Sequence, residues 1–146
     1  EIGFVGYDQG AVSLPTKAEE AEELVNQACP DALAISVGNV HLQTSADAVI
    51  DRGALGAIEA VVNCPLVLHG ASGIKAEDRG WLATNTKICK FNVGTELRQA
   101  FGAALRDVLA SDPYLFDRNQ ILSAVKPALL RKTRRIIKSF SGKVQI

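Results

Sequence analysis

The chain of 146 residues carries 16 Lys or Arg and 16 Asp or Glu residues, so its formal net charge is zero and no overall field would attract DNA or an anionic membrane. Aromatic residues make up only 5% of the chain, too few for a base-stacking platform, whereas 47% hydrophobic residues are enough for a sizeable core. The sequence has neither an apolar run of about 18 residues nor a signal-peptide pattern. We therefore expect a cytoplasmic protein that binds neither nucleic acid nor membranes.

The hydrophobic pattern predicts alternating strands and helices. In chain order it predicts a strand end and loop over 1–16, a helix over 16–29, a strand over 32–41, a helix over 52–62, a strand over 66–68, a helix over 75–84, a strand over 87–93, a helix over 95–110, a turn over 111–117 and a final helix over 119–140. Thr16 and Glu19 have the spacing of a capping box at the first helix. The final helix is basic, and we interpret its charges as a solvated or subunit-facing surface rather than a nucleic-acid contact.

This alternation of strands and helices is typical of a parallel sheet with right-handed crossovers. Two architectures are compatible with it, an open doubly wound sheet and a (βα)8 barrel. Because a complete barrel takes about 250 residues, the chain would supply roughly half of one.

The three cysteines, Cys29, Cys64 and Cys89, cannot all pair with one another, and none has CxxC spacing. We expect reduced thiols in an intracellular protein, each buried as a small hydrophobic residue. The chain also has no Met and opens inside a glycine-rich segment, EIGFVGYDQG. We interpret this opening as a sign of a fragment or a processed chain.

Polar residues stand where the predicted strands end, and in parallel βα folds these ends carry the chemistry. They are Asn39 and His41, His69 and Ser72, and Asn92 and Thr95. Both histidines of the chain fall at such ends, one strand apart. Neighbouring parallel strands lie about 4.8 Å apart and metal–nitrogen bonds are about 2.0–2.1 Å long, so the two imidazoles could bind one ion. A hydrogen-bonded structural role for the histidines is the alternative, and spacing alone leaves both open.

Two loops of small residues open onto predicted helices, HGASG over 69–73 and NVGT over 92–95. Small residues expose backbone N–H groups, and together with a helix N-terminus these groups form an anion cradle. Two cradles after consecutive strands match the phosphate site that barrels often place after strands 7 and 8. Alternatively, the glycines only permit tight turns between strand and helix.

These motifs together resemble the class II ketose-bisphosphate aldolases, with the tagatose- and fructose-bisphosphate aldolases as the nearest members. The resemblance runs over about the whole chain and rests on ALAISVGNVH at 32–41, LVLHGASG at 66–73, NVGTEL at 92–97 and the opening EIGFVGYDQG. Members of this family are zinc-dependent (βα)8 barrels that split a ketose phosphate into dihydroxyacetone phosphate and an aldehyde. The resemblance implies an α/β fold in which residues 1–146 form the C-terminal half of a single TIM barrel domain, with an appended C-terminal helix.

The resemblance also implies roles for individual residues. His41 and His69 match zinc ligands at the ends of the sixth and seventh strands, and Glu1 aligns with a glutamate near the metal. Asp8 is the best match to the mobile-loop acid that moves protons. Contacts to the substrate and its phosphate would come from Gly70, Ala71, Ser72, Asn92, Val93, Gly94 and Thr95. Zn²⁺ is the implied cofactor, and a monovalent cation is a second candidate.

The sequence departs from the family pattern at several places. His41 is followed by Leu42, where the family usually has a glycine that lets the backbone approach the phosphate. The loop around Asp8 is shorter than in the family. Ser123 stands nearest to an Arg or Lys that often grips a second phosphate, so the sequence leaves open whether the substrate carries one phosphate or two. We expect the family's first zinc-binding His, and the Asp beside it, to lie in an N-terminal half outside this chain.

We predict a class II aldolase-type lyase of carbohydrate metabolism, such as glycolysis, that performs zinc-assisted, reversible aldol cleavage of a phosphorylated ketose. The alternatives are a non-catalytic aldolase-like subunit or inactive fragment that supports a partner, and a phosphate-binding barrel enzyme without metal. Because half a barrel would expose strand edges and apolar faces, we expect a homo-oligomer or a complementing N-terminal half as partner, besides the small phosphorylated sugar. Catalytic zinc takes three protein ligands, so residues 1–146 alone should bind zinc weakly and lack turnover.

Overall fold

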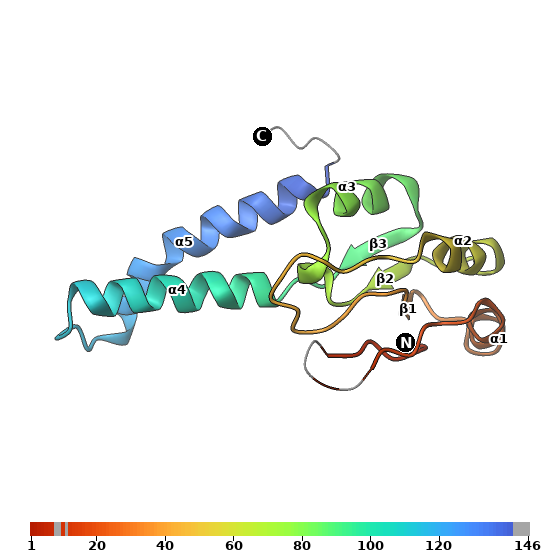
Figure 1. Ribbon diagram of the computed structural model, residues 1–146, viewed down its shortest axis with the longest axis horizontal. Coiled ribbons are helices and arrows are strands. Elements are labelled where there is room, and N and C mark those ends of the chain that lie inside the picture. The colour runs from red at the N-terminus through yellow and green to blue at the C-terminus, as the bar shows by residue number, and fades with distance from the viewer. Residues whose placement is uncertain (8–9, 11, 142–146) are drawn as a thin grey trace.

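The computed structural model describes residues 1–7, 10 and 12–141, which form an α/β fold around a parallel sheet (Figure 1). Its elements are α1 (Ala18–Ala28), β1 (Leu33–Ile35), α2 (Arg52–Val61), β2 (Leu66–Leu68), the short 3-10 helix η1 (Ala71–Gly73), α3 (Ala76–Asn85), β3 (Ile88–Phe91), α4 (Thr95–Ser111) and α5 (Arg118–Ser139). The predicted alternation of strands and helices is confirmed. Within the described residues, no helix combines the length and the apolar character needed to cross a membrane.

The strands lie in the order β1-β2-β3 and run parallel, with α2 and α3 as the crossovers between them. Residues 1–7 run along the free side of β1. The N–H of Ile2 donates to the carbonyl of Ala34 at 3.1 Å, and Tyr7 forms a parallel bridge with His41. The carboxyl ends of all these segments therefore meet at one edge of the sheet.

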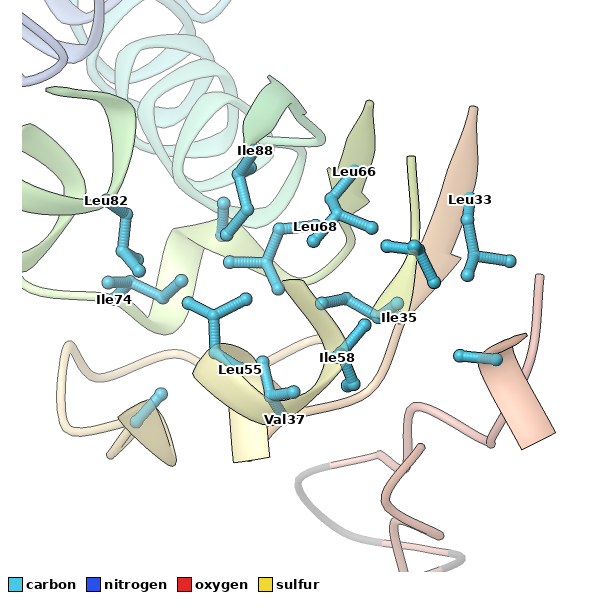
Figure 2. Close-up of a cluster of buried hydrophobic side chains, with 14 residues drawn as sticks. Leu33, Ile35, Val37, Leu55, Ile58, Leu66, Leu68, Ile74, Leu82 and Ile88 are labelled. Carbon is cyan, nitrogen blue, oxygen red and sulfur yellow. The ribbon is translucent and has the colours of Figure 1, made fainter. Parts of the chain in front are cut away.

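The core lies between the sheet and the helices that cross over it (Figure 2). The side chains that fill it are fully buried: Leu33 and Ile35 from β1, Leu66 and Leu68 from β2, Leu55 and Ile58 from α2, and Ile74 and Leu82 from the region of α3. Burying each of them contributes roughly 1.5–3 kcal/mol. Successive side chains of a strand point to opposite faces, and Val67 is buried on the other face, so β2 is covered on both sides as the sequence predicts.

The first strand is shorter than the predicted 32–41, because the chain turns at Gly38. This glycine has a φ of 97°, and a Cβ there would collide with the carbonyl of Val49. Only a glycine lets the loop that leads to α2 pack so closely against the end of β1.

The prediction of a capping box at Thr16 is wrong. Lys17 is the N-cap of α1, and no side chain caps this helix end. The hydroxyl of Thr16 instead donates to the carbonyl of Ile2 at 2.7 Å and accepts from the N–H of Ser36 at 2.8 Å. Thr16 therefore joins residues 1–7 to the end of β1.

The prediction that the cysteines are buried is wrong for Cys29 and Cys89, which are exposed, and holds only partly for Cys64; all three are free thiols. Cys29 follows the end of α1 with a φ of 45°, which turns it out of the helix. Cys89 is left out of the pairing between β2 and β3, because the register shifts and Val67 pairs with Lys90.

Helices α4 and α5 pack against each other and extend away from the sheet, and α5 returns to contact α3 (Figure 1). At its end, Phe140 stacks on Phe91 of β3 with 4.6 Å between the ring centroids. This contact anchors the C-terminal helix to the sheet.

Candidate metal and anion site

The only two histidines of the chain face each other at the carboxyl edge of the sheet. The ring centroids of His41 and His69 lie 5.6 Å apart, and the ring planes are nearly perpendicular, at 88°. His69 directly follows β2, whereas His41 lies beyond β1, on the segment that bridges to Tyr7. Because metal–nitrogen bonds are about 2.0–2.1 Å long, this separation suits two nitrogen ligands of one ion.

Each imidazole has a neighbour that orients it. The side-chain amide nitrogen of Asn92 lies 3.2 Å from Nε2 of His69; the amide donates and Nε2 accepts, and this contact restrains the ring. The ring of Tyr7 lies over His41 with 5.4 Å between centroids. These two contacts restrict the direction in which each imidazole points, and ring orientation is what contacts around a metal-binding histidine control.

The pKa of His41 lies below its ordinary value of 6.5, first because burial disfavours the charged imidazolium and second because His69 is close; the carboxylate of Glu1 acts in the opposite direction. A lowered pKa keeps His41 neutral at neutral pH. The neutral imidazole is the form that binds a metal ion.

The two other residues predicted for the metal and for catalysis have different outcomes. Across residues 1–7, 10 and 12–141, no three His, Cys, Asp or Glu side chains come close enough to hold a metal ion. Glu1 therefore does not complete a three-ligand set with the histidines, although it is near enough to influence the pKa of His41. Asp8 lies outside the described residues.

A cavity of about 490 Å³ opens beside the two imidazoles. It is lined by His41, Leu42, His69, Gly70, Ser72, Phe91, Asn92, Val93, Gly94, Thr95 and Arg98. All the predicted anion contacts except Ala71 are among these residues. The structure thus brings both histidines and both glycine-containing loops to one cavity.

Ala71 supports the loop instead of lining the cavity. Its side chain is fully buried, and its backbone N–H donates to the carbonyl of Asn92 at 3.1 Å. The backbone N–H of Ala71 therefore already has a partner in the fold, and its contact with a phosphate stays a prediction. The hydroxyl of Ser72, in contrast, accepts from the N–H of Glu96 at 3.3 Å, which leaves its proton for an anion.

The start of α4 forms the second wall of the anion site. Val93, Gly94 and Thr95 line the cavity, and Gly94, the N-cap, has no side chain to occupy the first N–H groups of the helix. The positive end of the helix dipole and these N–H groups attract anions. Arg98, which was not among the predicted site residues, lines the same cavity one turn into α4. Its position one helical turn after the NVGT loop is the sequence feature from which it could have been predicted.

Two residues in this site have backbone conformations that suit glycine. Gly70 has a φ of 64°, and a Cβ there would collide with the carbonyl of Val40. Leu42, directly after His41, has a φ of 58°, a conformation that costs a residue with a Cβ about 1–2 kcal/mol. Leu42 is among the residues that line the cavity, so a bulky residue occupies a position with glycine-like backbone.

The chain is similar to known proteins in sequence and in fold. Residues 1–144 match the family model described as fructose-bisphosphate aldolase class-II. The crystal structure of the YdjI aldolase from Escherichia coli K12 is similar over 89% of this chain, with 30% sequence identity and a TM-score of 0.67. A protein provisionally named as a fructose-1,6-biphosphate aldolase, from Coccidioides immitis, has the same fold over 98% of this chain, with 22% identity and a TM-score of 0.73. The matches cover 46% and 51% of those two proteins, so this chain spans about half of their length.

Proposed function

Because the chain belongs to the class II fructose-bisphosphate aldolase family, we propose that it takes part in the zinc-assisted, reversible aldol cleavage of a phosphorylated ketose to dihydroxyacetone phosphate and an aldehyde. One observation carries the proposal. The imidazoles of His41 and His69 lie 5.6 Å apart and face the cavity that Ser72 and the start of α4 also line. We call the hydroxyl of Ser72 and the first N–H groups of α4 the anion seat. An ion that polarises the carbonyl and the anion seat would then act on the same small substrate.

The proposal extends to the architecture. Residues 1–7, β1, β2 and β3 would be consecutive parallel strands of a (βα)8 barrel, with residues 1–146 as the C-terminal portion of one barrel domain. The parallel strand order supports this, as does the greater length of the similar structures, of which this chain covers 46% and 51%.

His41 and His69 would hold the zinc ion on which class II aldolases generally depend. Catalytic zinc usually takes three protein ligands, so the third would come from the part of the relatives' fold that this chain does not span. When bound, zinc polarises the substrate carbonyl and stabilises the negative charge that develops on its oxygen. The lowered pKa of His41 supports this role, since it keeps the ligand neutral.

The remaining residues would bind and orient the substrate. The hydroxyl of Ser72 and the first N–H groups of α4, around Gly94 and Thr95, would hold the phosphate and so fix the reacting carbons. Asn92 lines the cavity beside His69, where its amide would hydrogen-bond the substrate oxygens. We propose Asp8 for the proton transfer, because it is the best match in the opening segment to the acid that moves protons in this family, and a positioned carboxylate can serve as a general base.

A second candidate is a non-catalytic, aldolase-like subunit that supports a partner. The observation that favours it is Leu42, a bulky residue that lines the cavity directly beside His41. In either case we propose a phosphorylated sugar as ligand, and a second copy or a complementing N-terminal half as partner.

The decisive experiment combines zinc content with a partial reaction. In D2O, an aldolase exchanges a C–H proton of dihydroxyacetone phosphate for deuterium, and NMR follows this exchange without knowledge of the aldehyde. We expect one zinc per chain in the complete enzyme, and exchange that is lost in His69→Ala or with a chelator and restored by added zinc. Arg52→Gln is the control, since Arg52 pairs with Asp78 on the surface.

The other outcomes separate the alternatives. Bound zinc without exchange would favour the non-catalytic subunit. Exchange that survives both the chelator and His69→Ala would instead identify a metal-free enzyme and contradict the proposal.

A further inference from the structure

Arg79 on α3 is a buried charge that the proposed chemistry does not use. Only 4% of this residue is exposed, and it is not among the residues that line the cavity beside the histidines. Removing a guanidinium from water is costly unless its N–H groups are all well paired. Its partners therefore indicate what it does.

The guanidinium of Arg79 binds two successive carbonyls and one carboxylate. Its Nε donates to the carbonyl of Ala71 at 3.0 Å, and its Nη2 donates to the carbonyl of Ser72 at 3.1 Å. The same Nη2 pairs with the carboxylate of Glu96 in the first turn of α4. From α5, Lys132 pairs with the other oxygen of Glu96 at 2.7 Å.

These bonds set the direction of the backbone in the loop after β2. In a trans peptide the C=O and the following N–H point in opposite directions. Because the carbonyl of Ala71 points at Arg79, the N–H of Ser72 points away from Arg79. Ser72 lines the cavity beside the histidines, which Arg79 does not enter, so Arg79 fixes the orientation of the peptide group between Ala71 and Ser72 at the wall of the anion seat.

The same network joins the two walls of the seat. The N–H of Glu96 donates to the hydroxyl of Ser72 at 3.3 Å, and the N–H of Ala71 donates to the carbonyl of Asn92 at 3.1 Å. The ion pair between Arg79 and Glu96 adds a further link between the same two segments. These bonds therefore hold the loop after β2 and the start of α4 in a fixed position relative to each other.

A buried ion pair is rarely the most stabilising choice, since well-packed apolar residues of similar volume often give equal stability. Apolar residues, however, cannot bind two carbonyls and a carboxylate at once, whereas the planar fork of an arginine can. The main effect of Arg79 is therefore to orient the backbone of Ala71 and Ser72, and its effect on stability is secondary.

We infer that Arg79 is a positioning residue of the anion seat, which orients the backbone of Ala71 and Ser72 and, through Glu96, the start of α4. The inference rests on the proposed function only for the identity of the anion, a phosphate group. It does not require that the chain catalyses a reaction.

The test measures the affinity of the full chain for inorganic phosphate, by calorimetric or NMR titration, in Arg79→Lys. A lysine keeps the charge but cannot reach both carbonyls and Glu96 in one plane. We expect phosphate binding about tenfold weaker, equal to about 1.4 kcal/mol, with zinc affinity changed less than about twofold. In the exchange reaction of the complete enzyme, the KM for dihydroxyacetone phosphate should rise more than kcat falls.

A matched control and a rescue separate positioning from general stability. Arg52 also pairs with a carboxylate, Asp78, and stacks on Trp81 at 3.9 Å, but it is exposed. Arg52→Lys should therefore leave phosphate binding unchanged. In Arg79→Ala, added guanidinium should restore phosphate affinity. Glu96→Gln, which keeps the shape of the side chain, should weaken phosphate binding less than Arg79→Lys does.

The inference is overturned if folded Arg79→Lys binds phosphate as the unmodified chain does. It is overturned also if phosphate and zinc affinity fall together with the free energy of unfolding and guanidinium restores nothing, or if the unmodified chain binds no phosphate. Phosphate binding that depends on Arg79, in a protein that shows no proton exchange, would contradict the proposed function and leave this inference standing.

Discussion

The side-chain amide of Asn39 binds the backbone of His69: its Nδ2 donates to the His69 carbonyl at 3.0 Å, while its Oδ1 accepts from the N–H of Val37 at 2.8 Å. Asn39 is fully buried. Since Asn39 lies two residues before His41, one side chain sets the distance between the loops that carry the two imidazoles.

Asn39→Ala should weaken both the fold and the metal site. It leaves the buried N–H of Val37 and the partly buried carbonyl of His69 without their partner, at about 1–3 kcal/mol for the buried group and less for the other. We expect the free energy of unfolding, from urea denaturation, to fall by roughly 2–4 kcal/mol, and zinc affinity to fall with it. Asn63→Ala, at an exposed position, should stay within about 0.5 kcal/mol. Equal stability of the two variants would contradict the role given to Asn39.

The stability of the zinc-free chain should decrease in mild acid because of His41. Its folded-state pKa is lowered, chiefly by burial, so between the folded and unfolded pKa values the unfolded chain binds more protons. The contribution of His41 to the free energy of unfolding is fully present above its unfolded-state pKa of about 6.5. It is lost as the pH falls through its lower, folded-state pKa. Denaturation curves from pH 7.5 to 5 should show a smaller decrease in His41→Gln. Identical pH profiles for the two proteins would count against this assignment.

His69→Gln is the matched variant for the pH experiment. It removes the second cause of the lowered pKa of His41 and leaves the first, burial, in place. The acid-dependent loss of stability should therefore become smaller without disappearing.

Gly70→Ala should destabilise the chain, and Gly56→Ala should not. At Gly70 the φ of 64° costs an alanine about 1–2 kcal/mol, and its Cβ would also collide with the carbonyl of Val40. At Gly56, inside α2, a Cβ meets nothing within 4 Å, so alanine should stabilise by about 0.5–1 kcal/mol. Thermal denaturation of both variants tests this, and equal shifts in Tm would show that the turn at Gly70 is not restrained.

Leu42→Gly should enlarge the cavity at little cost in stability. The variant relieves a left-handed conformation worth about 1–2 kcal/mol. It also adds backbone entropy to the unfolded chain, which costs about 0.5–1 kcal/mol. The free energy of unfolding should therefore rise by no more than about 1.5 kcal/mol. Phosphate affinity should rise, because the leucine side chain no longer lines the cavity. Leu42→Ala keeps the strained backbone and shortens the side chain, which separates the two effects. Unchanged affinity in both variants would show that Leu42 does not restrict the site.

Much of the fold could be predicted because its signals are local. Apolar periodicity marks α2 and α4, and the short apolar run at Leu66–Leu68 marks β2, so their bounds in the structure lie close to the predicted ones. The meeting of His41 and His69 at one edge also follows from the sequence, since parallel strands connected by helices place their carboxyl ends side by side.

Other features depend on contacts between segments that lie far apart in the chain, and no local pattern records them. The end of β1 is set by the close approach of Val49 to Gly38, and the N–H of Ala71 is taken by the carbonyl of Asn92. The buried charge of Arg79 finds its partners only when the loop after β2 meets α4. The sequence by itself determined the order of elements and the chemistry present at the strand ends. Only the tertiary structure decided which of those donors remain available to a ligand, because packing uses some of them and leaves others facing the cavity.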